Sequence, residues 1–320
     1  MYDTYGDEFM AFAPIALFVY NRPDHTRRTL EALSQNELAD QSHLFIFADG
    51  PKQNVSEDQL DRIRQTRAVI REKQWCGKVD IIEADKNKGL AQSIIDGVTK
   101  IVNEFGKIIV LEDDLLTGKY FLQYMNDGLD VYENENKVVE IHGFMYSHRK
   151  ELPETFFIKG ADCWGWATWK RAWALFNPDG QYLLDELQRR KLEYVFDFDN
   201  TYGYVDMLKG QIAGRNNSWA IRWLASAFLA DCYTLYPSKS LVKNFGFDGS
   251  GTHCGDNDYL QNDEVYNERI LVHKIDAVVE NRAARKVFKQ EFASNHNFFV
   301  RCKRGVKKVL SKIRSVLCRK

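Results

Sequence analysis

The sequence predicts an α/β fold with a mostly parallel central sheet flanked by helices. Two observations lead to this prediction. Four short apolar runs between residues 15 and 111 alternate with segments of helical character, and each run ends in polar residues. Continuous apolar strands that alternate with helices are typical of a parallel sheet covered on both faces.

The expected elements of the first half are regular. Strands are expected over residues 15–20, 44–48, 79–83 and 107–111. Helices are expected between them, over residues 26–34, 57–74 and 90–105. Asp49-Gly50-Pro51 stops the second strand, and Asn87-Lys88-Gly89 precedes the third helix. The fourth strand runs directly into Glu112-Asp113-Asp114.

The second half is less regular, and we expect it to pack onto the same sheet. Its expected features are an aromatic loop over 156–173, helices near 182–195, 202–213 and 219–232, a strand over 233–236, and a Gly-rich loop over 244–253. No linker or internal repeat separates it from the first half. Trp164, Trp166, Trp169 and Trp173 are expected mainly in the core, with Trp164 or Trp166 free to stack on a sugar.

Composition narrows the class of protein. A hydrophobic fraction of 44% and a charged fraction of 28% are those of an ordinary globular chain. The six cysteines show no CxxC pair, and no apolar run approaches the ~20 residues of a membrane span. The acidic N-terminus lacks the apolar region of a signal peptide. These features predict a cytoplasmic protein with reduced thiols.

The acidic triplet Glu112-Asp113-Asp114 is the main candidate site. Three acids at the end of a buried strand are costly unless a cation neutralises them. Mg²⁺ or Mn²⁺ is held by one or two carboxylates, with phosphates and water completing the shell. Asp114 is therefore expected to bind the metal, while Glu112 and Asp113 contact a ribose or support the shell. The alternative is an acidic turn with one residue that caps a following helix from Leu115 onward.

The other strand ends offer candidate nucleotide contacts. Asn21 and Arg22 follow the first strand, and Asp49 follows the second, where its carboxylate could accept hydrogen bonds from a base. Asn87 and Gly89 could approach the ribose and phosphates, since glycine permits close backbone contact. Turns or surface positions explain each of these residues equally well.

Together these residues resemble the GT-A glycosyltransferases, in particular family-2-type enzymes and the N-acetylglucosaminyltransferase I family. The resemblance covers roughly residues 13–130, through Pro14-Ile-Ala-Leu-Phe-Val-Tyr-Asn-Arg-Pro23, Asp49 and Val110-Leu-Glu-Asp-Asp-Leu115. Cys163-Trp-Gly-Trp-Ala-Thr-Trp169 is similar to bacterial sugar transferases of cell-surface polysaccharide pathways. The resemblance implies a GT-A domain over 1–295, with a nucleotide-sugar-binding half (13–130) and an acceptor-binding half (131–295).

The resemblance also implies an inverting transfer from a nucleotide-diphosphate sugar, with a UDP-sugar favoured and Mn²⁺ or Mg²⁺ as cofactor. A hexosyl or N-acetylhexosaminyl group would pass to a hydroxyl of a glycan or lipid-linked glycan. His253 could complete the metal shell. In related enzymes a Trp-Asp segment supplies the base, whereas this chain has Ala220 after Trp219. Asp248, Asp162 and Asp206 are the candidate bases, with Asp248 slightly favoured.

The tail from 296 to 320 is a separate basic segment. Residues 301–320 hold nine cations and no acid, and their apolar residues recur at helical spacing. This pattern favours a helix lying on an anionic membrane through 297–320, at the inner face of the cytoplasmic membrane. Nucleic-acid binding is disfavoured by the acidic remainder of the chain. A solvated helix is the third interpretation.

Two rival functions remain at this point. A sugar nucleotidyltransferase also combines an α/β sheet with acidic metal ligands. It should, however, carry a Gly-rich run with a Lys after the first strand, which Asn21-Arg22-Pro23-Asp24 is not. A catalytically inactive GT-A-like protein, acting in binding or assembly at the membrane, is the rival that Ala220 favours.

Overall fold

The computed structural model describes residues 12–247 and 264–294. The predictions for Asp248, His253 and the basic tail therefore lie outside the described residues. Within them, the expected α/β architecture with a mostly parallel central sheet is confirmed.

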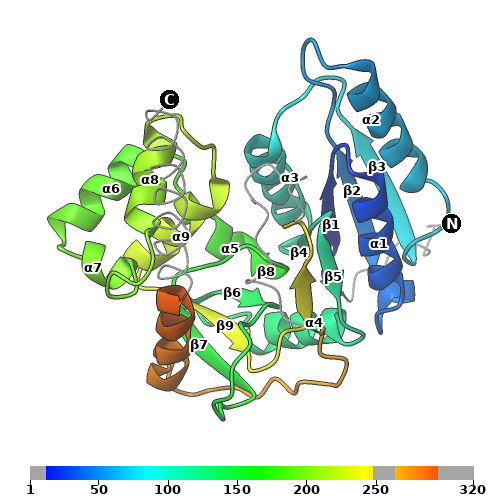
Figure 1. Cartoon of the computed structure of the whole chain (residues 1–320). Helices are drawn as coiled ribbons and strands as arrows, with labels where there is room; N and C mark the ends of the chain where they lie inside the picture. The colour runs from blue at the N-terminus through cyan, green and yellow to red at the C-terminus, as the bar shows by residue number, and fades with distance from the viewer. Residues whose placement is uncertain (1–11, 248–263, 295–320) are drawn as a thin grey trace, which may run out of the picture.

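An eight-stranded sheet runs through the middle of the molecule (Figure 1). Its strands are β1 (Ile15–Val19), β2 (His43–Ala48), β3 (Lys78–Glu83), β4 (Lys107–Glu112), β6 (Val138–His142), β7 (Thr155–Lys159), β8 (Trp166–Trp169) and β9 (Tyr233–Pro237). Their spatial order is β3-β2-β1-β4-β8-β6-β9-β7. Strands β8 and β7 are antiparallel to their neighbours, and the other six run in one direction. One sheet therefore spans both halves of the chain.

Helices cover the sheet and extend one end of it. They are α1 (Pro23–Ser34), α2 (Glu57–Val69), α3 (Leu90–Phe105), α4 (Phe121–Val131), α5 (Lys170–Trp173), α6 (Gly180–Arg189), α7 (Glu193–Phe196), α8 (Tyr204–Ile212) and α9 (Trp219–Leu229). Figure 1 shows α6, α7 and α8 on the side of the molecule away from α1 and α2, and α9 contacts both this group and α3. A short two-stranded sheet pairs β5 (Leu115–Thr117) with β10 (Val242–Asn244). A further helix occupies 282–294.

The first half of the chain follows the sequence prediction closely, and the second half does not. Helix α3 spans the residues expected of it, whereas α2 ends five residues earlier than the expected 57–74. The expected aromatic loop over 156–173 is wrong, because that range contains most of β7 and all of β8 and α5. Strand β8 is buried along its whole length. It consequently lacks the alternation of apolar and polar residues that marks a half-exposed strand.

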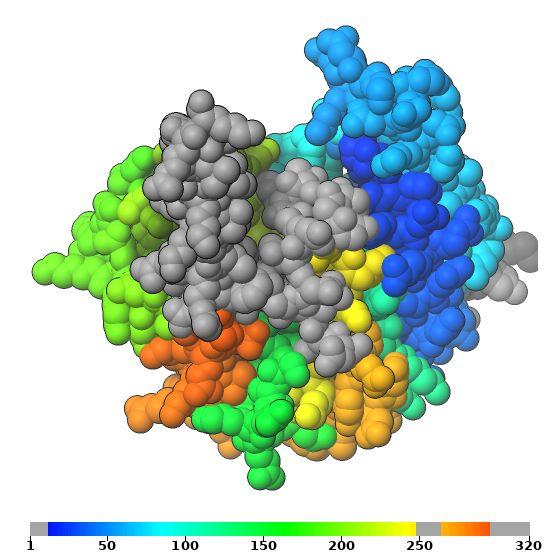
Figure 2. All heavy atoms as spheres, viewed as in Figure 1, coloured from blue at the N-terminus to red at the C-terminus, as the bar shows by residue number. Residues whose placement is uncertain are grey.

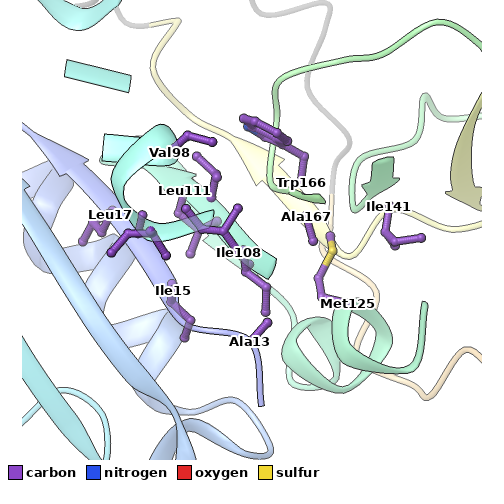
Figure 3. Close-up of a cluster of buried hydrophobic side chains, with 14 of the residues drawn as sticks. Ala13, Ile15, Leu17, Val98, Ile108, Leu111, Met125, Ile141, Trp166 and Ala167 are labelled. Carbon is purple, nitrogen blue, oxygen red and sulfur yellow. The ribbon is translucent and has the colours of Figure 1, made fainter. Parts of the chain in front are cut away.

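The core is continuous across the two halves. Figure 3 shows Ile15 and Leu17 of β1 and Ile108 of β4 in one cluster with Trp166 of β8 and Ile141 of β6. These five side chains are all fully buried. Each fully buried aliphatic side chain contributes roughly 1.5–3 kcal/mol relative to an exposed one. The shared core therefore holds β4, β8 and β6 together, with β8 between the other two strands.

Two smaller clusters stabilise the outer helices. Leu187, Leu208 and Phe228 pack α6, α8 and α9 together, and Phe288 and Phe292 pack the 282–294 helix against the far end of the sheet. Among residues 12–247 and 264–294, no helix is long and apolar enough to cross a bilayer. Cys76, Cys163 and Cys232 form no disulfide within these ranges.

Candidate active site at the carboxyl edge of the sheet

The polar strand ends predicted from the sequence lie along one edge of the sheet. Phe18 of β1 pairs with Glu112 of β4, and Val19 pairs with Ala48 of β2. Because these three strands are parallel and in this register, their carboxyl ends are level. Arg22, Asp49 and the acidic triplet therefore emerge at the same edge, where open α/β sheets bind their ligands. Asn21 lies beside them, half-buried at the end of β1.

Arg22 joins two of the three acids. Its Nη2 donates to Asp114 Oδ2 at 2.9 Å and also pairs with Asp113, while its Nε donates to Asp113 Oδ2 at 3.3 Å. Both carboxylates are buried. The remaining guanidinium nitrogen, Nη1, is buried without a hydrogen-bond partner among the described atoms. Such a donor is costly to leave unpaired, and it is available to a ligand that brings oxygen atoms.

The acids carry more negative charge than Arg22 neutralises. Burial, followed by the charges of Asp114 and Asp113, raises the pKa of Glu112 to about 8. Burial also raises the pKa of Asp113 to about 6, even though Arg22 opposes the effect. Burial alone would lower the pKa of Arg22, but Asp113 and Asp114 outweigh it and hold that pKa above its usual value. A second cation at this site would relieve the repulsion that remains.

The donor set suits a divalent ion that is shared with phosphates. No group of three or more His, Cys, Asp or Glu side chains is arranged as a metal cage in the part of the chain that the structure describes. Mg²⁺ commonly binds through one or two carboxylates and takes its other ligands from substrate phosphates and water. Asp113 and Asp114, which both pair with Arg22, could supply these one or two carboxylates.

Residues 245 and 246 lie directly against Asp114. The Phe245 amide donates to the Asp114 carbonyl at 2.9 Å, and a Cβ atom on Gly246 would come within 2.2 Å of Asp114 Oδ2. Only glycine permits this approach, because any side chain there would displace the carboxylate. The chain thus reaches Asp114 immediately before residue 248, where the segment with Asp248 and His253 begins outside the described residues.

Asp49 connects the end of β2 with the loop before α3. Its Oδ1 accepts from the Gly50 and Lys88 amides, both at 2.8 Å, and its Oδ2 accepts from Asn87 Nδ2 and the Gly89 amide, both at 2.9 Å. Four hydrogen bonds fill the usual acceptor capacity of a carboxylate. The expected contact between Asp49 and the base of a nucleotide stays a prediction. It requires that a hydrogen bond from the nucleotide base replace one of these four bonds.

The candidate bases lie in different surroundings. Asp162 is half-buried in the loop between β7 and β8. Asp206 is exposed in the first turn of α8, where its charge adds to the burial that raises the pKa of Asp197. Ala220 packs against the main core as the second residue of α9.

Three functional candidates beside Asp162 escaped the sequence analysis. Glu140 and His142 of β6 are both 0% exposed, and Tyr236 of β9 is also buried. Burial raises the pKa of Glu140, against the opposing influence of His142. The available signal was the strand Val138-Val-Glu-Ile-His142, in which an acid and a histidine interrupt an apolar run.

The tryptophans divide between core and site. Trp166, Trp169 and Trp173 are buried in the core, so Trp166 is excluded as a sugar-stacking residue. Trp164 is half-buried and makes edge contacts with Phe144 and with Phe247, whose ring centroid lies 5.7 Å away. Of these four tryptophans, Trp164 is therefore the one with a partly exposed side chain that a ligand could contact.

Among known proteins, the chain shows similarity to solved structures. No family model matches the chain, and no curated protein does. Similar structures include a mannosyltransferase from Pyrobaculum calidifontis determined with GDP-Man and Mn²⁺ (9% identity, TM-score 0.30, 42% of this chain and 35% of that one). TarS from S. aureus matches at 12% identity and a TM-score of 0.30, over 47% of this chain and 24% of its own.

UDP-glucose pyrophosphorylase in complex with UDP-glucose matches at 12% identity and a TM-score of 0.34, over 71% of this chain and 90% of its own. The matched regions thus span about a third of the mannosyltransferase and about a quarter of TarS. With every TM-score below 0.5, these similarities leave the reaction to be argued from the site residues.

Proposed function

We propose that this protein is a metal-dependent glycosyltransferase that moves a sugar from a nucleotide-diphosphate sugar to an acceptor hydroxyl. The observation that carries the proposal is the group formed by Arg22, Asp113 and Asp114 at the carboxyl edge of the sheet. It combines surplus negative charge for a divalent cation with an unpaired buried donor, Arg22 Nη1, for an anionic oxygen. A nucleoside diphosphate bound with Mn²⁺ or Mg²⁺ supplies both.

Each residue of this edge then has a role. Asp114 and Asp113 hold the cation, and Arg22 donates to a diphosphate oxygen through Nη1. The 87–89 loop, fixed by Asp49, lies beside the nucleoside, and Glu112 supports the charged group from the end of β4. A cation held there would supply Lewis-acid stabilisation to the departing diphosphate. A UDP-sugar is the expected donor, and inversion at the anomeric carbon is the expected outcome.

The acceptor half contains the second part of the proposal. Trp164 keeps an accessible surface at the same edge, where the apolar face of a sugar ring can stack. A hydroxyl of a glycan or lipid-linked glycan in bacterial surface polysaccharide synthesis fits this arrangement. The transferase would work at the inner face of the cytoplasmic membrane, attached through 297–320.

The Asp114→Ala variant tests the metal and donor site. Removing this carboxylate should weaken Mn²⁺-dependent binding of UDP at least about tenfold, which is about 1.4 kcal/mol. Isothermal titration calorimetry with UDP and with GDP, each with Mn²⁺ or with EDTA, measures the effect. Asp185→Asn, an exposed carboxylate on α6, is the matched control.

Unchanged UDP affinity in Asp114→Ala, with a thermal unfolding midpoint equal to that of the wild type, would overturn the metal assignment. A hydrolysis screen over UDP-glucose, UDP-galactose, UDP-N-acetylglucosamine and GDP-mannose tests the reaction itself. Mn²⁺-dependent release of nucleoside diphosphate is the expected result. Binding without any release in the presence of acceptor glycans would favour the inactive GT-A-like protein.

A further inference from the structure

A buried histidine lies between two carboxylates at the end of β6. His142 Nδ1 is 3.6 Å from Glu140 Oε1, and His142 Nε2 is 3.8 Å from Asp162 Oδ2. Both separations are longer than a hydrogen bond. Neither ring nitrogen has a hydrogen-bond partner among the described atoms, although the residue is fully buried. Two unsatisfied polar atoms cost stability, and a core of apolar residues would avoid this cost.

Asp162 is held in one orientation from several sides. Its amide donates to Glu140 Oε1 at 2.9 Å, its Oδ1 accepts from the Cys163 amide at 2.8 Å, and its Oδ2 accepts from the Tyr236 hydroxyl at 3.1 Å. Glu140 is itself fixed by Trp223 Nε1 at 2.7 Å. The Asp162 side chain nevertheless keeps 25% of its surface exposed. A carboxylate that is fixed and accessible can receive a proton from a bound molecule.

Asp162 belongs to the same edge as the acidic triplet. Trp166, at the start of β8, pairs with Val110 of β4 and with His142 of β6. Because β8 is antiparallel to β4, the residues that precede Trp166 lie on the side toward which β4 ends. The loop with Asp162 and Trp164 is therefore on the side of Glu112 and Asp114, and His142 ends β6 on that side.

We propose, resting on the transferase function above, that Asp162 is the catalytic base for the acceptor and that His142 and Glu140 are its positioning residues. Asp162 takes the proton of the acceptor hydroxyl while that oxygen bonds to the anomeric carbon. The bond from this carbon to the diphosphate oxygen breaks, and its electron pair leaves with the nucleoside diphosphate. Glu140 holds the Asp162 backbone, and His142 supports the Oδ2 side of the carboxylate.

His142 lies close enough to Asp162 for a small movement to give one of its unsatisfied nitrogens a hydrogen-bond partner. A shift of less than ~1 Å would bring Nε2 within hydrogen-bond distance of Asp162, and catalytic hydrogen bonds often tighten when substrate binds. The imidazole then orients the base, as third groups do in other catalytic sets. The fold bears the cost of a buried polar ring where a phenyl ring would fill similar space.

Asp162→Asn is the first test of the base. General base catalysis typically contributes about 10²–10⁴-fold, so kcat for donor hydrolysis should fall by that order. The donor is whichever of UDP-glucose, UDP-galactose, UDP-N-acetylglucosamine and GDP-mannose the wild type hydrolyses fastest with Mn²⁺. Calorimetric affinity for UDP with Mn²⁺ should stay unchanged. Asp206→Asn and Asp248→Asn are measured in parallel, with Asp185→Asn as control.

His142→Phe tests the positioning role. The variant should lower kcat about tenfold or more while KM for the donor and UDP affinity stay constant. Its thermal unfolding midpoint should equal or exceed that of the wild type, because it removes two unsatisfied polar atoms. His142→Gln restores a donor toward Asp162 and should recover part of the lost kcat.

The outcomes separate the two proposals. Failure of the wild type to bind UDP with Mn²⁺ and to hydrolyse any donor would overturn the proposed function, and the base assignment with it. If the wild type is active and Asp162→Asn is equally active, the base assignment is overturned and the proposed function stands. The same conclusion follows if Asp248→Asn is the variant that loses turnover and Asp162→Asn does not. A His142→Phe variant that unfolds early with normal kcat would assign His142 a structural role.

Discussion

At the residue scale, the acidic triplet holds charge that Arg22, its ion-pair partner among the described residues, does not fully balance. Glu112 lies next to Asp113 and Asp114, and Arg22 is the cation that pairs with the two aspartates. Burial and the two neighbouring carboxylates raise the pKa of Glu112 to about 8, from an ordinary value of 4.5. Without a second cation, Glu112 therefore holds a proton beside the two carboxylates that are proposed to bind the metal.

The stability of the metal-free protein should consequently depend on pH. Between about pH 4.5 and 8, folded Glu112 keeps a proton that the unfolded chain has released. Its stabilising contribution is therefore complete below about pH 4.5 and is lost as the pH rises through about 8. One proton gives a slope of at most about 1.4 kcal/mol per pH unit.

Urea denaturation of the wild type and Glu112→Gln between pH 5 and 8, in EDTA, measures this effect. The wild-type free energy of unfolding should fall relative to that of the variant as the pH rises. When Mn²⁺ and UDP replace EDTA, the free energy of unfolding of the wild type should fall less with rising pH. Parallel curves for the two proteins would contradict the raised pKa.

At the element scale, Asp49 connects β2 with the start of α3. Helix α3 begins after Gly89, which has a φ of +76° and no side chain to cap the helix. The Gly89 amide instead donates to Asp49 Oδ2. A carboxylate near a helix N-terminus also interacts favourably with the helix dipole. Asp49 thus orders the loop that is proposed to lie beside the nucleoside.

Asp49→Ala should destabilise the fold and weaken nucleotide binding together. It leaves the amides of Gly50, Lys88 and Gly89 without this acceptor, whereas Asn87 keeps its bond to the Gly50 carbonyl, and one such loss costs about 1–3 kcal/mol. Asp49→Asn retains one acceptor oxygen. Its stability and its UDP affinity should lie between those of Asp49→Ala and those of the wild type. Urea midpoints and UDP calorimetry measure the two effects. An Asp49→Ala protein as stable as the wild type would show that the loop is ordered by other contacts.

At the scale of the whole molecule, one sheet contains strands from both halves of the chain. Ile141 of β6 pairs with Ala167 of β8, and Ile109 of β4 pairs with the same residue from the other side. Figure 1 shows α6, α7 and α8 on the opposite side of the molecule from α1 and α2, and Figure 2 shows green atoms of the second half and blue atoms of the first half on the same two sides. The charge is also arranged on this scale, with nine cations in residues 301–320 of a chain whose net charge is −1.

Removal of residues 297–320 should release the protein from anionic vesicles. Each Lys or Arg near such a surface contributes about 1 kcal/mol, which 0.5 M salt should largely screen. Sedimentation with vesicles of phosphatidylcholine containing phosphatidylserine, or of phosphatidylcholine alone, measures the binding. The truncated chain should keep the wild-type unfolding midpoint, because the three described apolar clusters lie within residues 13–292. Full retention on anionic vesicles after truncation would contradict the proposed role of the tail.

The sequence by itself determined the first half of the fold. Strands β1, β2 and β4 are largely apolar runs, and polar residues follow each of them closely in the chain. Local pattern and connection order are sufficient to place such strands in a parallel sheet. Arg22, Asp49 and Glu112-Asp113-Asp114 could be assigned to one edge for the same reason.

Only the tertiary structure decided which partners these residues meet. The pairing of Arg22 with Asp113 and Asp114 joins positions 91 and 92 residues apart. The same holds for Asp162, whose neighbour Tyr236 is 74 residues away along the chain. Hydrophobic periodicity carries no information on such contacts, because they depend on strand order and register rather than on local spacing. A single sequence therefore located the strand ends, and the folded sheet brought the acids, the arginine and the buried histidine together.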